Sequence, residues 1–275
     1  MIMKDEIEYI DVHNIDVLIS FFPKIKSLFA ECFERELNKD LWEWAYLDNP
    51  CGTPLVSLAL FNGKVIGHYA VIPQILTNNK KKLIGYLSMT TMVSANFRRF
   101  GLFQLLAERV YSKIDANKIP SVVYGFPNHN SIAGFRKRLG WIISDEYKVR
   151  RIHPNDWHCQ CSLIQGAETE GSFQLDMSEE KIKEWRCNKP NQVWDIHQGI
   201  GVKEINDAYD LMYYATVNDL FKFKPDKSVN IVSPFSDVEN EDDRNVLFPY
   251  RFGYRTFNME NELSFNVQMC MSDVF

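Results

Sequence analysis

The order of hydrophobic and polar positions in the first 150 residues predicts alternating strands and helices. Apolar residues recur at spacings of three and four over 16–33, as on one face of a helix, although Pro23 can split it. Two β-branched apolar runs, 55–61 and 64–73, are joined by an Asn-Gly pair, which predicts a hairpin. The same criteria predict strands at 6–12, 83–93, 121–126 and 141–151 and helices at 38–46, 103–117 and 130–139. The predicted fold class is therefore α+β (mixed α/β), with antiparallel hairpins followed by a β-α-β-α-β unit.

After residue 150 the pattern is weaker. The segment 151–165 is strand-like, and the alternation of apolar and polar residues over 263–271 predicts a strand with one buried face. A predicted helix with Trp185 precedes a Lys-Pro turn and β-rich sequence, as a helix with Trp44 does before an Asn-Pro turn. The second part is either a reduced structural repeat of the first or an α/β extension that forms part of an acceptor pocket or an interface. The two expected parts are residues 1–150 and 151–275.

The composition excludes several classes of function. Of 275 residues, 45% are hydrophobic and 24% are charged, which is typical of a folded protein. The 31 Lys and Arg against 36 Asp and Glu give a net charge of −5, which argues against a main function in binding nucleic acid. No apolar stretch approaches the ~20 residues of a membrane span, and the charged N-terminal segment lacks the pattern of a secretory signal. Six cysteines, with Cys159 and Cys161 as the one close pair, predict neither a disulfide framework nor a metal site. We therefore expect a cytoplasmic protein.

The segment Arg98-Arg99-Phe100-Gly101-Leu102-Phe103 is the part of the sequence that suggests chemistry. It follows a predicted strand and begins a predicted helix. The first N–H groups of a helix have no partners inside the helix and carry a partial positive charge, so they favour an anion. A glycine lets the backbone approach a ligand closely, and arginine binds phosphate through two parallel hydrogen bonds. These residues therefore predict a phosphate site.

This segment resembles motif A of the GNAT acyltransferase family, Arg-x-x-Gly-x-Gly/Ala, in which backbone amides hold the pyrophosphate of acyl-CoA. Here Phe103 stands where the family has glycine or alanine. Residues 125–131 and 135–141, with Asn128 before a helix and Leu-Gly-Trp after it, resemble motif B. The resemblance covers about residues 5–150, and the order of the elements matches throughout.

The resemblance implies a GNAT fold, in which a central mixed sheet flanked by helices splays after a bulge. The gap admits the thioester arm of acetyl-CoA or another short-chain acyl-CoA. The strands concerned are 87–93 and 122–126. The backbones of Met92 and Val93 are expected to bind the pantetheine arm, and Asn128 is expected to contact it from the neighbouring strand end. The implied coenzyme contacts also include two positions on the motif B helix, Phe135 and Arg136.

The resemblance also implies that an amine attacks the thioester directly, while a backbone N–H stabilises the oxyanion. Family members often use a Glu on the strand before motif A as base and a Tyr on the motif B helix as acid. The strand 87–92 has no carboxylate here, and Phe135 or Arg136 stands at the tyrosine position. The remaining candidates for proton transfer, besides ordered water, are His129, Tyr86, Tyr124 and His68.

The acceptor is suggested by the second part, where aromatic and basic residues alternate at 221–224 and 248–255. Such pairs stack on a base and hold phosphate, although they are equally typical of core aromatics beside surface cations. The two-part layout resembles GNAT enzymes that acylate nucleotide-linked (dTDP or UDP) deoxyamino sugars for surface polysaccharides. The expected partner is therefore such a small-molecule amine, with a homodimer as a further option. The alternatives are a GNAT acetyltransferase of another small amine, antibiotic or peptide, and a non-catalytic acyl-CoA sensor.

Overall fold

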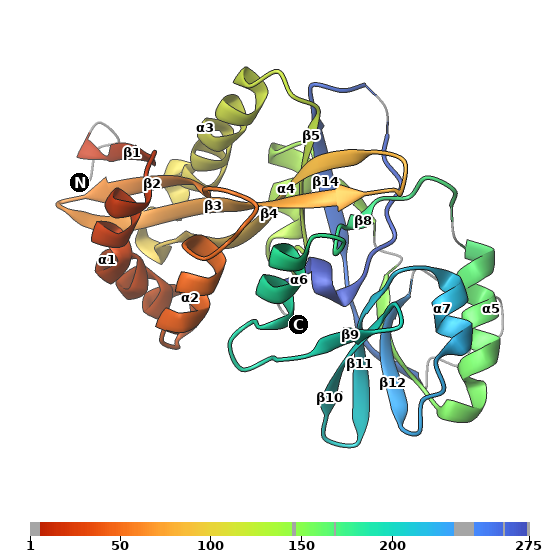
Figure 1. Ribbon diagram of the computed structural model, residues 1–275. Coiled ribbons are helices and arrows are strands. Elements are labelled where there is room, and N and C mark those ends of the chain that lie inside the picture. The colour runs from red at the N-terminus through yellow and green to blue at the C-terminus, as the bar shows by residue number, and fades with distance from the viewer. Residues whose placement is uncertain (1–5, 145–146, 168, 234–244, 261, 274–275) are drawn as a thin grey trace.

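Two β-sheets organise the chain, as the computed structural model shows for residues 6–144, 147–167, 169–233, 245–260 and 262–273 (Figure 1). The first sheet has the order β1-β2-β3-β4-β5-β14-β6, with β8 paired to β3, and the second has the order β13-β7-β12-β11-β10-β9. The strands of the first sheet are β1 (Glu8–Val12), β2 (Leu55–Phe61), β3 (Lys64–Thr77), β4 (Lys82–Val93), β5 (Ser121–Gly125), β6 (Ile142–Ser144), β8 (Gln174–Leu175) and β14 (Phe252–Phe257). The strands of the second are β7 (Lys148–Ile152), β9 (Asp195–His197), β10 (Ile200–Ile205), β11 (Ala208–Tyr214), β12 (Ser228–Ser233) and β13 (Val246–Pro249).

Helices cover both faces of the first sheet, which confirms the predicted mixed sheet flanked by helices. One face carries α1 (Ile15–Phe33) and α2 (Lys39–Tyr46), and the other carries α3 (Leu102–Ala116) and α4 (Ile132–Arg138). The side chain of Asn14 accepts a hydrogen bond from the Val17 N–H and so caps α1. The helix then continues unbroken through Pro23. The remaining α-helices of the described chain are α5 (Trp157–Ala167), α6 (Glu180–Cys187) and α7 (Val217–Lys222).

The order of strands along the chain does not separate the two sheets. β14 comes from the C-terminal part of the chain, yet it lies between β5 and β6 of the first sheet. β7 comes soon after β6 in the chain, yet it pairs with β12 of the second sheet. The boundary expected near residue 150 lies within β7 (Lys148–Ile152). Each sheet therefore contains strands from both sides of that boundary.

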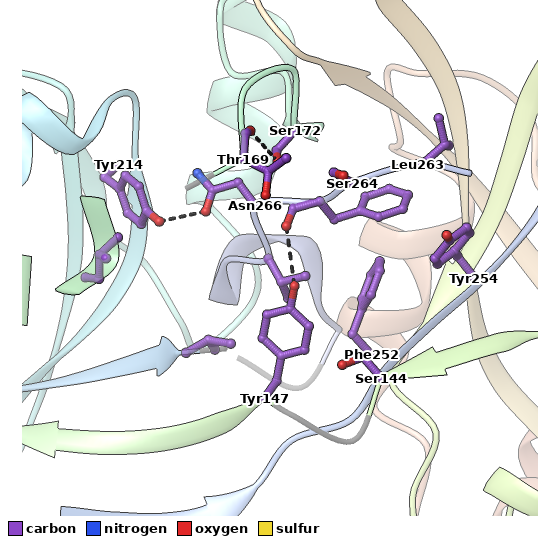
Figure 2. Close-up of a pocket in the computed structure, with 14 residues that line it drawn as sticks. Ser144, Tyr147, Thr169, Ser172, Tyr214, Phe252, Tyr254, Leu263, Ser264 and Asn266 are labelled. Carbon is purple, nitrogen blue, oxygen red and sulfur yellow. Dashed lines mark hydrogen bonds between the residues drawn. The ribbon is translucent and has the colours of Figure 1, made fainter. Parts of the chain in front are cut away.

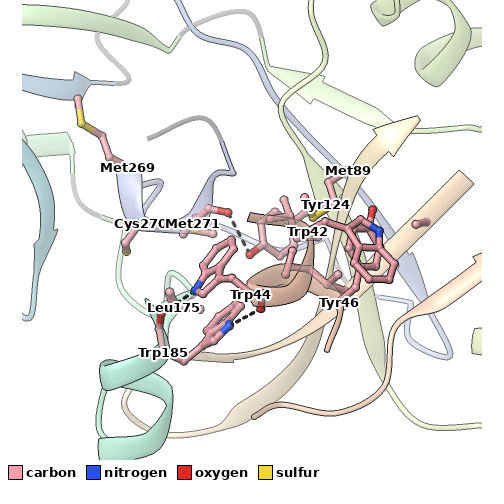
Figure 3. Packing of buried hydrophobic residues seen from close by; sticks show 14 of the residues in the cluster. Trp42, Trp44, Tyr46, Met89, Tyr124, Leu175, Trp185, Met269, Cys270 and Met271 are labelled. Carbon is pink, nitrogen blue, oxygen red and sulfur yellow. Dashed lines mark hydrogen bonds between the residues drawn. The ribbon is translucent and has the colours of Figure 1, made fainter. Parts of the chain in front are cut away.

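The two sheets follow a similar chain path. In the first, antiparallel β2, β3 and β4 are followed by α3 and the parallel strand β5. In the second, antiparallel β9, β10 and β11 are followed by α7 and the parallel strand β12. The preceding helices, α2 and α6, carry Trp44 and Trp185, whose rings stack 4.7 Å apart (Figure 3). Each indole N–H donates to the other residue's carbonyl oxygen, at 2.7 and 2.8 Å. The sequence similarity around the two tryptophans therefore marks equivalent positions in two units of similar topology.

Two predictions for the second part are wrong. Only the first residues of 151–165 are in a strand, and Trp157–Ala167 forms α5. Its buried positions, Trp157, Cys161 and Ile164, follow helical spacing. The segment 263–271 contains an isolated bridge at Phe265 and a 3-10 helix, η5 (Met269–Met271), instead of a strand. All three residues of η5 are buried, so its side chains do not divide into one inner and one outer face.

Candidate active site

The parallel strands β4 and β5 separate halfway along β4, as the resemblance implies. Their pairing runs from Ile84 opposite Ser121 to Leu87 opposite Tyr124 and stops there. β4 continues to Val93, still paired with β3 on its other side. Residues 88–93 therefore present an edge that no strand of the described residues pairs with, and we call this edge the first splay. Backbone N–H and C=O groups at such an edge can bind an extended ligand.

A β-bulge precedes Met92 and Val93, the two positions of β4 that are expected to bind the coenzyme. Met89 pairs with Ala70 and Met92 pairs with His68, so two residues of β4 face the single Tyr69 of β3. Met89 and Met92 are both buried in the core beneath α1 and α2, although they lie three residues apart. The backbone of Thr90 has φ 54°, in the left-handed region that a β-branched residue rarely adopts. The bulge thus turns the chain just before Met92 and Val93.

The predicted phosphate site is a tight turn between β4 and α3. A 3-10 helix, η2 (Ala95–Phe100), ends at Gly101, whose φ is 71°. The Leu105 N–H donates to the Gly101 carbonyl oxygen, which begins α3 and leaves the earlier N–H groups of its first turn without helical partners. A Cβ atom at Gly101 would meet nothing within 4 Å, so this side of the turn is open. Arg98 and Arg99 are both exposed beside it. The turn therefore combines helix N–H groups with two cations.

Phe103, where the family has glycine or alanine, packs against α4. A Cβ atom at Gly134 would lie 3.0 Å from the Phe103 ring, so the absence of a side chain there makes room for the ring. Phe103 also meets Phe135 edge-on at 5.1 Å. Phe135 is buried against Trp141, whereas Arg136 is exposed and donates to the Ile143 carbonyl oxygen. The replacement thus changes the packing between α3 and α4, while the turn at Gly101 is retained.

Asn128 is exposed at the start of the α4 segment. Its side-chain oxygen accepts hydrogen bonds from the N–H groups of Asn130 and Ser131, at 3.0 and 3.1 Å. This arrangement orders the chain between the end of β5 and α4. It occupies the amide oxygen and leaves the side-chain NH2 group to contact a ligand.

The four proton-transfer candidates differ in environment. His129 is exposed in the loop after β5. Burial raises the pKa of Tyr86, which is half-buried on β4. Burial also raises the pKa of Tyr124 far above its usual value, and the hydroxyl of this residue donates to Gln74. His68 is 1% exposed, and burial lowers its pKa to about 4. Only His129 and, in part, Tyr86 are therefore accessible to solvent.

A pocket of about 310 Å³ lies where the carboxyl-terminal edges of the two sheets meet (Figure 2). Ser144 at the end of β6 and Phe252 at the start of β14 line it from the first sheet, and Tyr214 at the end of β11 lines it from the second. Phe265 supplies a further aromatic face, and Asn266 accepts a hydrogen bond from the Tyr214 hydroxyl at 2.6 Å. Ligands of α/β sheets characteristically bind at such edges.

Two aromatic residues of the segments singled out in the sequence line this pocket. Phe252 and Tyr254 belong to the aromatic and basic segment 248–255, and both line the pocket. Two of the basic residues in these segments bond to the protein itself: Arg255 donates to the Leu139 carbonyl oxygen, and Lys222 pairs with Asp219. Tyr214 and Asn266 were missed. The signal that places them is the pairing of strands far apart in the chain, which the local pattern does not contain.

Residues 17–144 match the family model described as the acetyltransferase (GNAT) domain. No curated protein matches the sequence. Solved structures with a similar fold include a probable N-acyltransferase of unknown function from Enterococcus faecalis, at 10% identity and a TM-score of 0.60, and a GCN5-related N-acetyltransferase from Kribbella flavida, at 12% and 0.60. A GCN5-related N-acetyltransferase from Anabaena variabilis has 12% identity and a TM-score of 0.58. Each of the three alignments covers 90% of this chain and 72% of the other.

The structural similarity therefore extends over both sheets, whereas the family model covers the segment from α1 to β6. At these identities the solved structures establish a shared fold. Within the described residues, no helix has the length and apolar character needed to cross a bilayer.

Proposed function

We propose that this chain, in which residues 17–144 form a GNAT acetyltransferase domain, is an N-acyltransferase that moves an acyl group from acyl-CoA to a primary amine. The first splay carries this proposal. It offers a free strand edge at residues 88–93, directly before the turn that holds Gly101 and two arginines. An extended amide-containing arm fits the edge, and the attached pyrophosphate fits the turn. Acetyl-CoA, or another short-chain acyl-CoA, has both parts.

The proposed reaction is a direct transfer. The neutral amine attacks the thioester carbonyl carbon, the C–N bond forms, the C–S bond breaks, and CoA leaves as a thiol after gaining a proton. The N–H of Met92 or Val93 stabilises the negative charge that develops on the carbonyl oxygen. Holding the two reactants together supplies about 7–11 kcal/mol of the barrier reduction. His129, which is exposed, and ordered water are the candidates for moving the two protons.

The pocket between the two sheet edges is the proposed acceptor site. Phe252, Tyr254 and Phe265 offer ring faces, and Ser264, Asn266 and the Tyr214 hydroxyl offer hydrogen bonds. Aromatic faces beside hydroxyl and amide groups suit a sugar ring, which has apolar C–H faces and polar edges. We therefore propose an amino sugar as acceptor, and a nucleotide-linked deoxyamino sugar as its most specific form. Another small amine, an antibiotic or a peptide is the alternative.

The test measures release of free thiol when the purified protein is incubated with acetyl-, propionyl- and butyryl-CoA and a panel of amines. The panel contains free amino sugars, dTDP- and UDP-linked amino sugars, aminoglycosides and peptide amines. Thiol release with an amino sugar supports the proposal, and inhibition by dTMP or UMP supports the nucleotide-linked form. Acyl-CoA binding without thiol release for any amine favours the non-catalytic sensor instead.

A further inference from the structure

We propose that His68 is a positioning residue, which holds the β4 bulge in its strained conformation and thereby keeps the first splay open for acyl-CoA. The inference rests on the proposed function. It assigns to a buried histidine of β3 a role in coenzyme affinity that acts through Thr90, without contact between His68 and the acyl group.

Thr90 is the strained point of β4. Its φ of 54° costs conformational energy for a β-branched side chain, so it persists only where neighbouring groups over-determine it. Without the bulge, residues 90–93 would shift their register against β3 by one position. A shift of one residue turns every side chain of a strand to the opposite face of the sheet. The bulge therefore decides which backbone groups of Met92 and Val93 face the splay.

His68 makes the contact that fixes this conformation. Its Nδ1 atom lies 2.8 Å from the Thr90 carbonyl oxygen. A carbonyl oxygen only accepts, so Nδ1 carries the hydrogen and the neutral imidazole has its lone pair on Nε2. Nε2 is buried and has no hydrogen-bond partner among the described residues. Burying an unpaired polar atom is unfavourable, so the contact with Thr90 is what a histidine provides here that an apolar residue would not.

The surroundings hold His68 in place. Tyr46 of α2 meets the imidazole edge-on, with ring centroids 6.3 Å apart, and Trp42 stacks on Tyr46 at 5.7 Å. Burial raises the pKa of Tyr46, while the adjacent Thr90 side chain lowers it in part. The bulge is thus held from β3 by His68, whose ring is packed in turn against Tyr46 of α2. Across the strand pair, His68 lies opposite Met92, the first proposed coenzyme-binding residue.

The test compares three variants with the wild type by acyl-CoA affinity in calorimetry and by kcat. His68→Asn keeps an N–H donor near the Nδ1 position but has no titratable base. His68→Leu keeps the bulk and loses the donor. The double variant His68→Leu with Thr90→Gly places at position 90 a residue that adopts positive φ without strain.

We expect His68→Leu to bind acyl-CoA about tenfold more weakly, equivalent to about 1.4 kcal/mol. We expect His68→Asn to keep both affinity and kcat within about threefold of the wild type, because its side chain still offers an N–H donor to the Thr90 carbonyl oxygen. A threefold change corresponds to less than about 1 kcal/mol. Glycine at position 90 should restore most of the affinity lost in His68→Leu. If His68 served only the stability of the fold, glycine at position 90 would not restore the acyl-CoA affinity that His68→Leu loses.

Two results overturn the inference. If His68→Asn binds acyl-CoA normally but loses about a hundredfold in kcat, His68 acts as a base. If His68→Leu binds as tightly as the wild type, the bulge does not depend on His68. Should His68→Leu fail to fold, the single variant Thr90→Gly still tests the inference, because it must bind acyl-CoA at least half as tightly as the wild type. A wild-type protein that binds no acyl-CoA contradicts the proposed function itself.

Discussion

Both sheets contain a gap between parallel strands, and in the second sheet a side chain of the protein fills it, whereas in the first sheet the gap is the proposed site of acyl-CoA. In the second sheet, β11 pairs with β12 from Ala208 to Asp210 and then continues to Tyr214 paired with β10 alone, just as β4 continues beyond Leu87 paired with β3 alone. There the side-chain amide of Gln268 bonds both the N–H and the carbonyl oxygen of Tyr214, each at 3.0 Å. In the second sheet, the Gln268 amide thus bonds the strand edge. In the first splay, the proposed partner of that edge is an amide group of the ligand. We call this filled gap the second splay.

The turns that follow the two gaps differ in charge. After β4 come Arg98, Arg99 and a glycine with positive φ. After β11, the first turn of α7 contains Asp219, which accepts hydrogen bonds from Thr216 and Lys222. A carboxylate at the start of a helix occupies the position that a phosphate would take. The two sheets thus share a topology but differ at this point, because the proposed coenzyme site combines a free strand edge with positive charge.

The largest effect should follow when the contact that fills the second splay is removed. Gln268→Met keeps the shape of this 3%-exposed side chain but removes its two hydrogen bonds to the Tyr214 backbone and the one that it donates to the Gln174 side chain. We expect the free energy of unfolding to fall by about 3 kcal/mol, because three buried hydrogen bonds are lost at about 1 kcal/mol each. Urea unfolding measures this loss, and calorimetry should still give one acyl-CoA per chain. Binding of a second acyl-CoA would contradict the role given to charge.

The next effect tests the cations of the first splay. Arg98→Gln with Arg99→Gln removes two charge-assisted contacts, and acyl-CoA affinity should fall about a hundredfold. The matched control is Lys181→Gln with Lys224→Gln, which removes two exposed cations elsewhere and should leave the affinity unchanged. Equal affinity in the two double variants would show that the pyrophosphate does not bind at this turn.

A pH titration separates the two gaps further, because His68 ionises and Gln268 does not. The pKa of His68 is lowered to about 4 by burial, whereas a histidine in an unfolded chain titrates near ~6.5. Between these values the unfolded state binds the additional proton, so stability is lost as the pH falls. From pH 7 to pH 5 the wild type should lose about 2 kcal/mol through this residue.

The measurement is the free energy of unfolding of the wild type and of His68→Asn at both pH values. His68→Asn should lose about 2 kcal/mol less than the wild type between pH 7 and pH 5. Gln268→Met should keep the pH dependence of the wild type. Identical pH dependence in wild type and His68→Asn would mean that His68 takes up its proton equally in the folded and unfolded states.

The sequence predicted the first sheet better than the second for a physical reason. Between β1 and β6 the elements are local: Asn62-Gly63 closes a hairpin, and Asn14 caps a helix with its own side chain. In the second sheet, by contrast, β7 pairs with β12, and β14 leaves to complete the first sheet. Such pairings join residues about eighty or more positions apart, and no local spacing encodes them.

The same distinction applies to the candidate site. The turn at Gly101 and the end of β4–β5 pairing at Leu87 were predicted, because a short motif marks the first and the resemblance to the GNAT family implies the second. The identity of the bulged residue, Thr90, was not predicted. Threonine does not favour positive φ by itself, and its conformation here depends on the tertiary contact with His68. Helical spacing in α5 was available in the sequence and was misread because its apolar positions are few.

The smallest expected effect concerns the acidic turn of the second sheet. Asp219→Asn removes an ion pair with Lys222, whose side chain is 69% exposed, so unfolding free energy should change by less than about 1 kcal/mol. The number of acyl-CoA molecules bound should stay at one, because Gln268 still occupies the second splay. Combining Asp219→Asn with Gln268→Met tests both obstacles at once. If calorimetry on that double variant shows weak second-site binding that neither single variant has, the two sheets differ only in these two features. If it does not, the arginines and the positive-φ glycine of the first turn are required as well.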